Sequence, residues 1–117
     1  MKTISVKRVY EDKSDDDGYR VFIDRLWPRG VSKEDAHFDE WLKELAPSTE
    51  LRKWFDHVPE RFEEFRKRYK EELQDHKEDL DKLRNKAKSK KITLLFAAKN
   101  EEMNNAVVIK EILENHD

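Results

Sequence analysis

The residues best suited to chemistry follow a short apolar stretch near the N-terminus, where Val21-Phe22-Ile23 leads into Asp24-Arg25-Leu26-Trp27-Pro28-Arg29-Gly30. Binding and catalytic residues gather in turns at strand ends. Arg25 and Arg29 carry planar guanidinium groups suited to bidentate capture of a carboxylate or phosphate. Asp24 would orient one of them or act as a general base. We therefore take Asp24 and Arg25 as candidate catalytic residues and Arg29 as a ligand-binding candidate. The alternative is a purely structural Asp–Arg ion pair that fixes the loop, with Trp27 in the core.

A second candidate anion site follows the continuous apolar run 92–98, which ends in Lys99-Asn100. A helix is expected to begin at Glu101, so its backbone N–H groups and the positive end of its dipole would face the same side. Lys99 adds a mobile positive charge, and Asn100 either caps the helix or hydrogen-bonds a ligand. The carboxylates of Glu101 and Glu102 would weaken this field. Lys99 and Asn100 are nonetheless ligand-binding candidates.

Other polar residues complete the candidate ligand-binding set. Asn104 and Asn105 are unusual in an otherwise apolar helix and could face the same pocket, and of the two Asn104 joins the ligand-binding candidates. Arg52 is close in sequence to His57, which is expected between two helices, and Arg52 joins the ligand-binding candidates. If the apolar strands are parallel, their carboxyl ends bring the two segments together.

Composition excludes several other kinds of site. The chain of 117 residues has no cysteine, which excludes a disulfide scaffold, a thiol enzyme and a zinc–thiolate site. It has only two glycines, too few for a P-loop or a dinucleotide-binding fingerprint. Its four histidines show no metal-binding spacing. We expect neither a metal nor a cofactor.

The charge of the chain is large but balanced. Charged residues make up 44% of the sequence, yet 25 basic and 27 acidic residues nearly cancel, and 10% of the residues are aromatic. Disordered chains usually have few aromatics and a large net charge, so we expect a compact domain. No apolar run is long enough to span a membrane, and the N-terminus lacks a secretory signal. We expect a cytoplasmic protein with no membrane partner, and the oligomeric state stays open.

Hydrophobic patterning predicts the elements that position the candidates. Segments 4–10, 19–23 and 92–98 are predicted strands, the last one central because both its faces are apolar. Apolar residues at helical spacing predict helices over 38–45, 48–55, 59–87 with a break near 74–76, and 101–115. The acidic cluster 15–18, between the first two strands, is predicted to be a solvated turn rather than a metal-binding loop. Together these features predict a single α/β domain over residues 1–117, with a small, mostly parallel sheet of about three strands flanked by about five helices.

A function of a different class would use the basic end of the helical region, residues 84–91. Its basic residues are Arg84, Lys86, Lys88, Lys90 and Lys91, which could serve a nucleic-acid or protein interaction module. Nearby acidic residues offset this charge, and cations at a helix end are also favoured by the dipole alone. An anionic small molecule is therefore the preferred partner, and nucleic acid is the alternative.

Several strings in the chain resemble the YeaO-like bacterial family, a domain of unknown function. They are the Asp24–Gly30 string above, Lys7-Arg8-Val9-Tyr10, Ser48-Thr49-Glu50-Leu51-Arg52 and Leu94-Leu95-Phe96-Ala97-Ala98-Lys99-Asn100. The resemblance covers almost the whole chain and implies a small α/β cytoplasmic protein without an established activity.

Two positions depart from that family pattern. The family often has Ser where Ala97 stands and His where Asn105 stands, so a hydroxyl and an imidazole are missing here. If either group were a nucleophile or a base, catalysis by this member would be impaired. The sequence therefore favours the candidates that are kept here as the functional residues, namely Asp24, Arg25, Arg29, Lys99 and Asn100.

Overall fold

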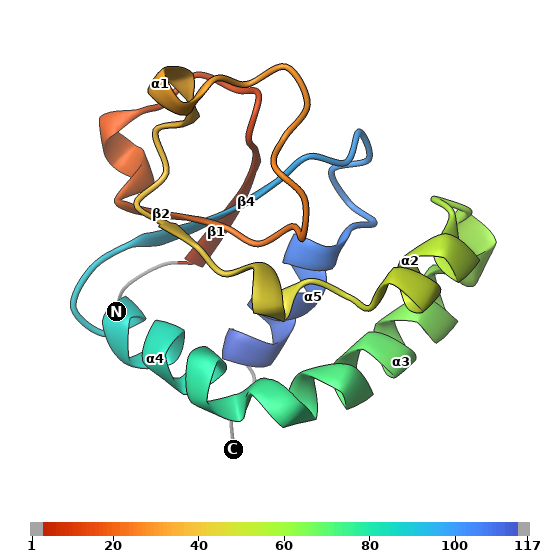
Figure 1. Ribbon diagram of the computed structural model, residues 1–117. Helices are drawn as coiled ribbons and strands as arrows, with labels where there is room; N and C mark the ends of the chain where they lie inside the picture. The colour runs from red at the N-terminus through yellow and green to blue at the C-terminus, as the bar shows by residue number, and fades with distance from the viewer. Residues whose placement is uncertain (1–3, 115–117) are drawn as a thin grey trace.

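The structure, a computed structural model, describes residues 4–114, and a run of helical elements separates its first three strands from the fourth (Figure 1). The strands are β1 (Ile4–Arg8), β2 (Tyr19–Phe22), β3 (Glu40–Trp41) and β4 (Ile92–Phe96). The α-helices are α1 (Lys33–Ala36), α2 (Thr49–Phe55), α3 (Phe62–Leu73), α4 (Lys77–Ala87) and α5 (Asn105–Glu114). Short 3₁₀ helices occupy η1 (Asp15–Asp17), η2 (Lys43–Leu45), η3 (Pro59–Arg61) and η4 (Gln74–His76).

The strands form one parallel sheet in the order β1-β4-β2-β3, which confirms the predicted α/β class. The strand β4 is central, as its continuous apolar sequence predicts, and all five of its residues are buried. It pairs with β1 from Ile4 opposite Ile92 and with β2 from Tyr19 opposite Ile92. The carboxyl ends of β2 and β4 therefore lie side by side at one edge of the sheet.

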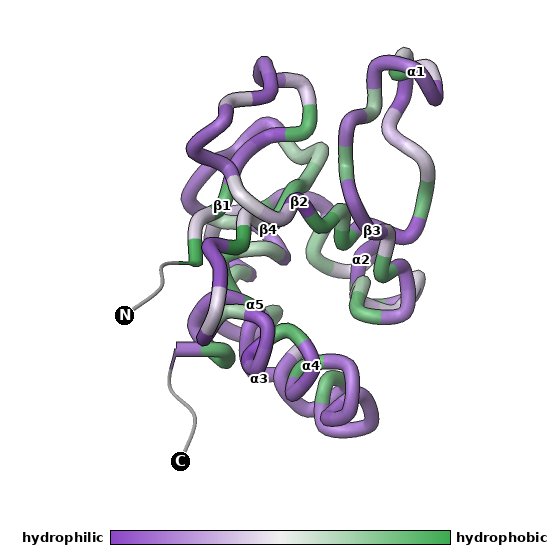
Figure 2. Tube along the Cα trace, turned by 90° about the vertical axis from the view of Figure 1, so that its left-hand side faces the viewer, coloured by the Kyte–Doolittle hydropathy of each residue, from purple (hydrophilic) through white to green (hydrophobic). Residues whose placement is uncertain are grey.

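The two faces of the sheet bury different partners because strand side chains alternate in direction. On one face, Val21 and Leu94 pack with the main helical core. On the other, Phe22 and Leu95 pack beneath Phe38 and Trp41. The helix α5 lies between the sheet and the arc formed by α3 and α4, as Figures 1 and 2 both show. The fold is thus a layered one, with the segment after β2 covering the face opposite α5.

The charged region of the sequence forms α3 and α4, and most residues along both helices are hydrophilic (Figure 2). The buried positions include Phe65, Tyr69 and Leu80, at the spacing expected of an amphipathic helix. The 3₁₀ helix at 74–76 confirms the predicted break. An α-helix rises about 1.5 Å per residue. An unbroken helix over 59–87 would therefore be longer than 38 Å, the longest dimension of the fold. Within residues 4–114, no helix combines the length and apolar character that crossing a membrane requires.

The helix predicted over 38–45 is wrong. The chain there forms β3, followed by the single 3₁₀ turn η2, which gives the sheet a fourth strand. Backbone bonds to β2 are responsible: the N–H of Asp39 donates to the carbonyl of Arg20 at 2.7 Å, and that of Leu42 to the carbonyl of Phe22 at 2.9 Å. The apolar spacing of this segment matches a helix, but pairing with β2 satisfies its backbone instead.

The last helix begins later than predicted. It starts at Asn105 rather than Glu101, because Asn104 Oδ1 accepts the backbone N–H of Val107 at 3.0 Å and so caps the helix. The predicted end at Asn115 lies outside the described residues.

The prediction of a solvated turn at 15–17 is wrong for Asp17, which is 6% exposed. Its carboxylate accepts hydrogen bonds from the guanidinium of Arg20 and from Lys7 Nζ. Arg20 is itself 1% exposed, so this is a buried ion pair. Among residues 4–114, no group of acidic or histidine side chains has the arrangement of a metal site.

Candidate functional site

Asp24 lies at the point where β2 leaves the sheet, beside the end of β4. The N–H of the preceding residue, Ile23, still donates to the carbonyl of Leu95 at 3.2 Å. One residue later the chain diverges, and Asp24 Oδ2 accepts the backbone N–H of Ala97 at 3.0 Å. At this point the carboxylate of Asp24, instead of the backbone of β2, accepts the first backbone N–H after β4.

The other Asp24 oxygen is bound to the start of α5. Asn105 Nδ2 donates to Oδ1 at 2.8 Å. The main-chain carbonyl of Asp24 accepts a third bond, from Trp41 Nε1 at 2.7 Å. This single residue thus joins the segment after β4, the first residue of α5 and the strand β3.

The environment of Asp24 raises the pKa of its carboxyl group above the ordinary value of 3.8. Burial is the main cause, since it disfavours the charged form. Hydrogen bonds from Asn105 and Ala97 and the positive charges of Arg52 and His57 oppose the rise without cancelling it. A carboxyl group whose pKa is raised by burial and that lies beside a cavity is a candidate functional residue.

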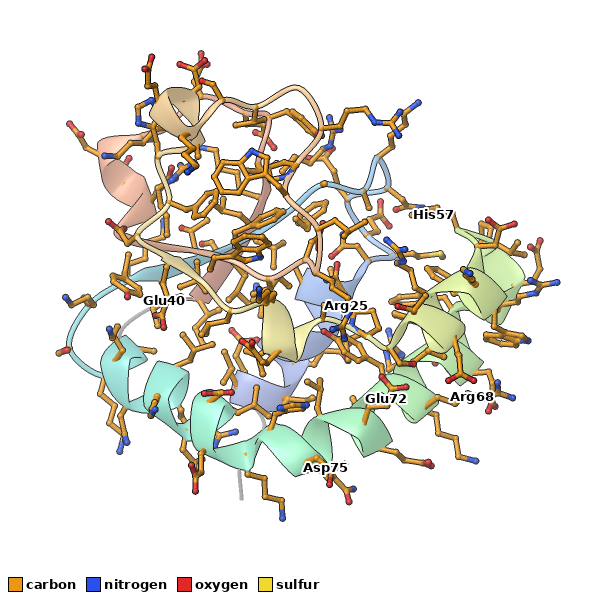
Figure 3. All side chains as sticks on the ribbon, viewed as in Figure 1. Arg25, Glu40, His57, Arg68, Glu72 and Asp75 are labelled. Atoms are coloured by element: carbon orange, nitrogen blue, oxygen red, sulfur yellow. The ribbon has the colours of Figure 1, made fainter. Side chains whose placement is uncertain are left out.

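A cavity of about 480 Å³ opens beside Asp24. Its lining brings together Arg25, Arg29 and Arg52 with His57, and Asp24 is the only acidic residue among the lining residues. The strand-end turn supplies the first two, and α2 with the turn after it supplies the others. Figure 3 shows Arg25 in the segment after β2 and His57 beyond the end of α2. The positive side chains converge from two separate parts of the chain.

The position of Arg52 follows from the way α2 begins. Ser48 Oγ accepts the N–H of Leu51 at 3.1 Å and donates to Glu72 Oε2 at 2.6 Å. The N-cap is therefore anchored to α3, which fixes the direction of α2. At the other end, Asp56 and His57 adopt left-handed backbone conformations, with φ of 46° and 56°. That tight turn brings His57 back to the cavity.

The structural alternative for the strand-end turn does not describe this fold. None of the ion pairs found in the described chain joins Asp24 to Arg25 or Arg29. Both arginines are exposed, and Arg25 Nη2 makes only a long bond of 3.4 Å to the carbonyl of Pro47. Trp27 is 36% exposed rather than in the core, although its ring contacts Phe38 and Trp41.

Comparison with known proteins places these features in a family. The model of the inactive DUF488-N3 subclade matches residues 3–116. The chain belongs to this family. The uncharacterized protein YeaO of Escherichia coli K12 is 46% identical to it over 110 residues, which cover 94% of this chain and 96% of the relative. The uncharacterized proteins Rv3073c of Mycobacterium tuberculosis H37Rv and Mb3100c of Mycobacterium bovis are each 44% identical, covering 94% of this chain and 92% of theirs.

The DUF488-N3 match confirms the YeaO-like resemblance seen in the strand-end strings. No solved structure matches the chain. The fold and the site of this member therefore rest on its own geometry.

The second segment lies differently in this DUF488-N3 fold from what its sequence suggests. Lys99 is exposed and is not among the residues that line the cavity. Asn100 Oδ1 accepts the N–H groups of Glu102 and Met103, at 2.9 and 3.0 Å, so its side chain closes the turn before α5. Asn104 lines the cavity but is 2% exposed, and its amide caps α5 and bonds to the carbonyl of Asn100.

Two residues near Asp24 were missing from the predicted site residues. Asn105 is expected from the sequence only to face the same pocket as Asn104; it does line the cavity, and its side chain also contacts Asp24. Tyr69 is fully buried and donates its hydroxyl to the carbonyl of Leu45. Burial raises the pKa of Tyr69 well above 10.0, and the charges of Asp24 and Glu72 raise it further. In the sequence, Tyr69 is indistinguishable from the other apolar positions of α3.

Proposed function

We propose that this protein binds a small anionic molecule in the cavity at the carboxyl ends of β2 and β4. One observation carries the proposal: three arginines and a histidine line the same cavity with a single carboxylate. Guanidinium groups suit carboxylate and phosphate oxygens because they offer paired donors in a plane. We take the protein to act in the cytoplasm, on the sequence-based expectation alone.

The single carboxylate is outnumbered by three guanidinium groups in the lining of the cavity. Both oxygens of Asp24 already accept hydrogen bonds, from Asn105 and from Ala97. The field in the cavity is therefore dominated by Arg25, Arg29 and Arg52.

Binding without turnover fits this member better than catalysis. The subclade that matches the chain is described as inactive. Ala97 and Asn105 stand where the YeaO-like family often has Ser and His, and both positions hydrogen-bond to Asp24. We therefore assign Asp24 the role of holding the cavity wall in place through its bonds to Asn105 and Ala97. The role of general base, considered from the sequence, is the less supported one.

Isothermal titration calorimetry with inorganic phosphate, at low salt and neutral pH, tests the proposal. We expect Arg52→Ala to weaken binding by roughly tenfold or more, since a hydrogen bond to a charged group contributes about 1.5–3 kcal/mol. Arg25→Ala should act in the same direction. The neighbouring Lys53→Ala is the matched control, because Lys53 is exposed on α2 and does not line the cavity.

The same titration decides between the two strand-end segments. Lys99→Ala should leave the affinity unchanged, because Lys99 lies outside the cavity lining. Equal losses in Arg52→Ala and Lys53→Ala, or no detectable binding by any of these proteins, would overturn the proposal.

The alternative function, an interaction module at residues 84–91, has weaker support. Arg84 donates to the carbonyls of Ile112 and Leu113, at 3.1 and 3.4 Å, and to Asp81 at 2.7 Å. Lys86 lies 4.0 Å from the centre of the Tyr19 ring. Two of the basic side chains are thus engaged within the molecule, and the neighbouring groove also contains Glu40 and Asp79. Binding to an oligonucleotide that falls steeply with salt would revive this alternative.

A further inference from the structure

The cavity beside Asp24 is divided into an apolar interior and a cationic rim. Its deeper lining includes Ala46, Phe55 and Phe65, which are 7%, 6% and 2% exposed. Phe55 and Phe65 are stacked with their ring centres 4.4 Å apart. The arginines Arg25, Arg29 and Arg52 are all exposed. Positive charge is therefore available at the entrance, whereas the interior offers aromatic and aliphatic surface.

The volume of the cavity exceeds what a bare anion needs. It measures about 480 Å³, whereas an apolar cavity of about 150 Å³ is enough to hold benzene. It falls within the range of about 300–1,000 Å³ that is typical of small-molecule sites. An inorganic anion held at the arginines would leave the exposed apolar side chains of the lining, such as Leu26 and Trp27, in contact with water, and that contact is unfavourable.

Aromatic side chains also frame the entrance. Trp27 and Tyr10 line the cavity and are 36% and 42% exposed. Tyr and Trp are enriched at binding interfaces because each has an apolar ring and a polar group that can hydrogen-bond. Trp27 is held in place, since its Nε1 donates to the carbonyl of Val31 at 2.6 Å. A planar group entering between the rim and the interior would contact these rings.

We infer that the ligand is an aromatic ring carrying one phosphate or carboxylate group, with the ring in the apolar interior and the anion at the arginine rim. This inference rests on the proposed function, because it assumes that the arginines hold the anion. It adds a second requirement, an apolar body, that anion binding alone does not impose.

Calorimetric titrations with four probes separate the two requirements. The probes are inorganic phosphate, phenyl phosphate, benzoate and the uncharged benzyl alcohol. We expect phenyl phosphate to bind at least about tenfold more tightly than inorganic phosphate, because transfer of the ring out of water adds to the charge interaction. Comparison with benzoate shows which anionic group the rim prefers. Benzyl alcohol should bind at least about tenfold more weakly than the tighter of the two aryl anions.

Two variants test where the ring is bound. Ala98→Leu adds bulk at the lining, and it should remove the advantage of phenyl phosphate while leaving inorganic phosphate unaffected. Met103→Ala removes an apolar lining side chain from the segment before α5, and it should lower the affinity for phenyl phosphate severalfold. Thermal unfolding of both variants verifies that they fold. If Ala98→Leu does not fold, Met103→Ala still tests where the ring is bound.

The outcomes distinguish the inference from the proposed function. If phosphate binds in an Arg52-dependent way but phenyl phosphate and benzoate bind no more tightly, the inference is overturned and the proposed function stands. If benzyl alcohol binds as tightly as phenyl phosphate and Arg52→Ala has no effect, both are overturned. An advantage for the aryl anion that Ala98→Leu or Met103→Ala removes supports the inference.

Discussion

Asn105 donates its side-chain amide to Asp24 Oδ1 at 2.8 Å, across 81 residues of sequence. The other oxygen of Asp24 is bonded to the backbone N–H of Ala97, which any residue except proline would supply. Of the two positions that depart from the YeaO-like pattern, 97 contacts Asp24 through its backbone, and 105 contacts it through its side chain. The side chain at that position decides what the carboxylate contacts.

The raised pKa of Asp24 predicts a pH dependence of stability. Because the folded protein holds this proton more tightly than the unfolded chain, protonation stabilises the fold at low pH, and that contribution is lost as pH rises through the folded-state pKa. The free energy of unfolding of the native protein should fall relative to that of Asp24→Asn as pH rises from about 4 to 7. Urea unfolding across this range measures the difference.

Asp24→Asn is a suitable comparison because its amide can keep both contacts. The side-chain oxygen of the new Asn can accept the backbone N–H of Ala97. Its NH₂ can donate to the side-chain oxygen of Asn105 once the Asn105 amide group rotates by 180°. Asp75→Asn, at an exposed position in η4, is the control. Parallel pH profiles for the native protein and Asp24→Asn would contradict the assignment.

Removal of the Asn105 side chain should destabilise the protein. Asn105→Ala leaves one oxygen of a largely enclosed carboxylate without a donor, which costs about 1–3 kcal/mol. It also removes a hydrogen bond that lowers the pKa of Asp24, so the pH dependence above should become steeper. Urea unfolding of this variant and of Asn85→Ala, an exposed position in α4, measures the effect. The control should change by no more than about 0.5 kcal/mol, and equal effects would refute the role of Asn105.

The buried pair of Asp17 and Arg20 should be the most sensitive ion pair in the fold. Asp17→Ala leaves the guanidinium of Arg20, 1% exposed, without its partner. Removing one member of a buried pair costs about 3–5 kcal/mol. Asp15→Ala is the control in the same 3₁₀ helix, because Asp15 is exposed. Thermal and urea unfolding report the difference, and a loss of less than about 1 kcal/mol would contradict a buried pair.

Asp17 also carries a pH dependence of opposite sign to that of Asp24. Burial raises the pKa of its carboxyl group, but hydrogen bonds from Ser14, Lys7 and Arg20 and the charge of Lys7 outweigh it, so the pKa lies below 3.8. The folded state therefore releases this proton more readily, and the stabilisation is present above 3.8 and is lost as pH falls through the folded-state pKa. A native protein that gains stability relative to Asp17→Asn on acidification below pH 3.8 would contradict this.

The two glycines should respond differently to substitution by alanine. Both have positive φ, 67° at Gly18 and 78° at Gly30, so each variant bears a conformational cost of about 1 kcal/mol. A Cβ at Gly18 would lie 2.4 Å from the backbone oxygen of Lys91, whereas a Cβ at Gly30 meets nothing within 4 Å. Gly18→Ala should thus be destabilised by at least about 2 kcal/mol more than Gly30→Ala, as measured by urea unfolding. A smaller loss at Gly18 would show that the close approach is absent.

The sheet was predictable where a strand is apolar along its whole length. The strand β4 was placed correctly, including its central position, because both faces of residues 92–96 are apolar. The strand β3 was not, because it has only two residues and Phe38, Trp41 and Leu42 recur at helical spacing. Whether β3 forms depends on its pairing with β2, and the sequence of residues 38–45 alone does not predict that pairing.

The site was predictable to the extent that it follows strand ends. The turn after β2 was found because charge follows an apolar strand, and parallel pairing brings Asp24 to the end of β4. Arg52 reaches the same cavity only through the anchoring of α2 on α3. The burial of Asp17 was missed because three consecutive aspartates do not reveal which one is enclosed. Arg20, three residues later, was the available signal.

The central position of β4 sets the order in which the protein can fold during synthesis. Ile4 pairs with Ile92, so β1 has no partner in the sheet until most of the chain has left the ribosome. Only the short pairing of β2 with β3 is available to the nascent chain before then. The sheet therefore closes late, through contacts of high sequence separation, which is a slow route for a protein of this size. Until then, chaperones would meet a chain whose strands have unpaired edges.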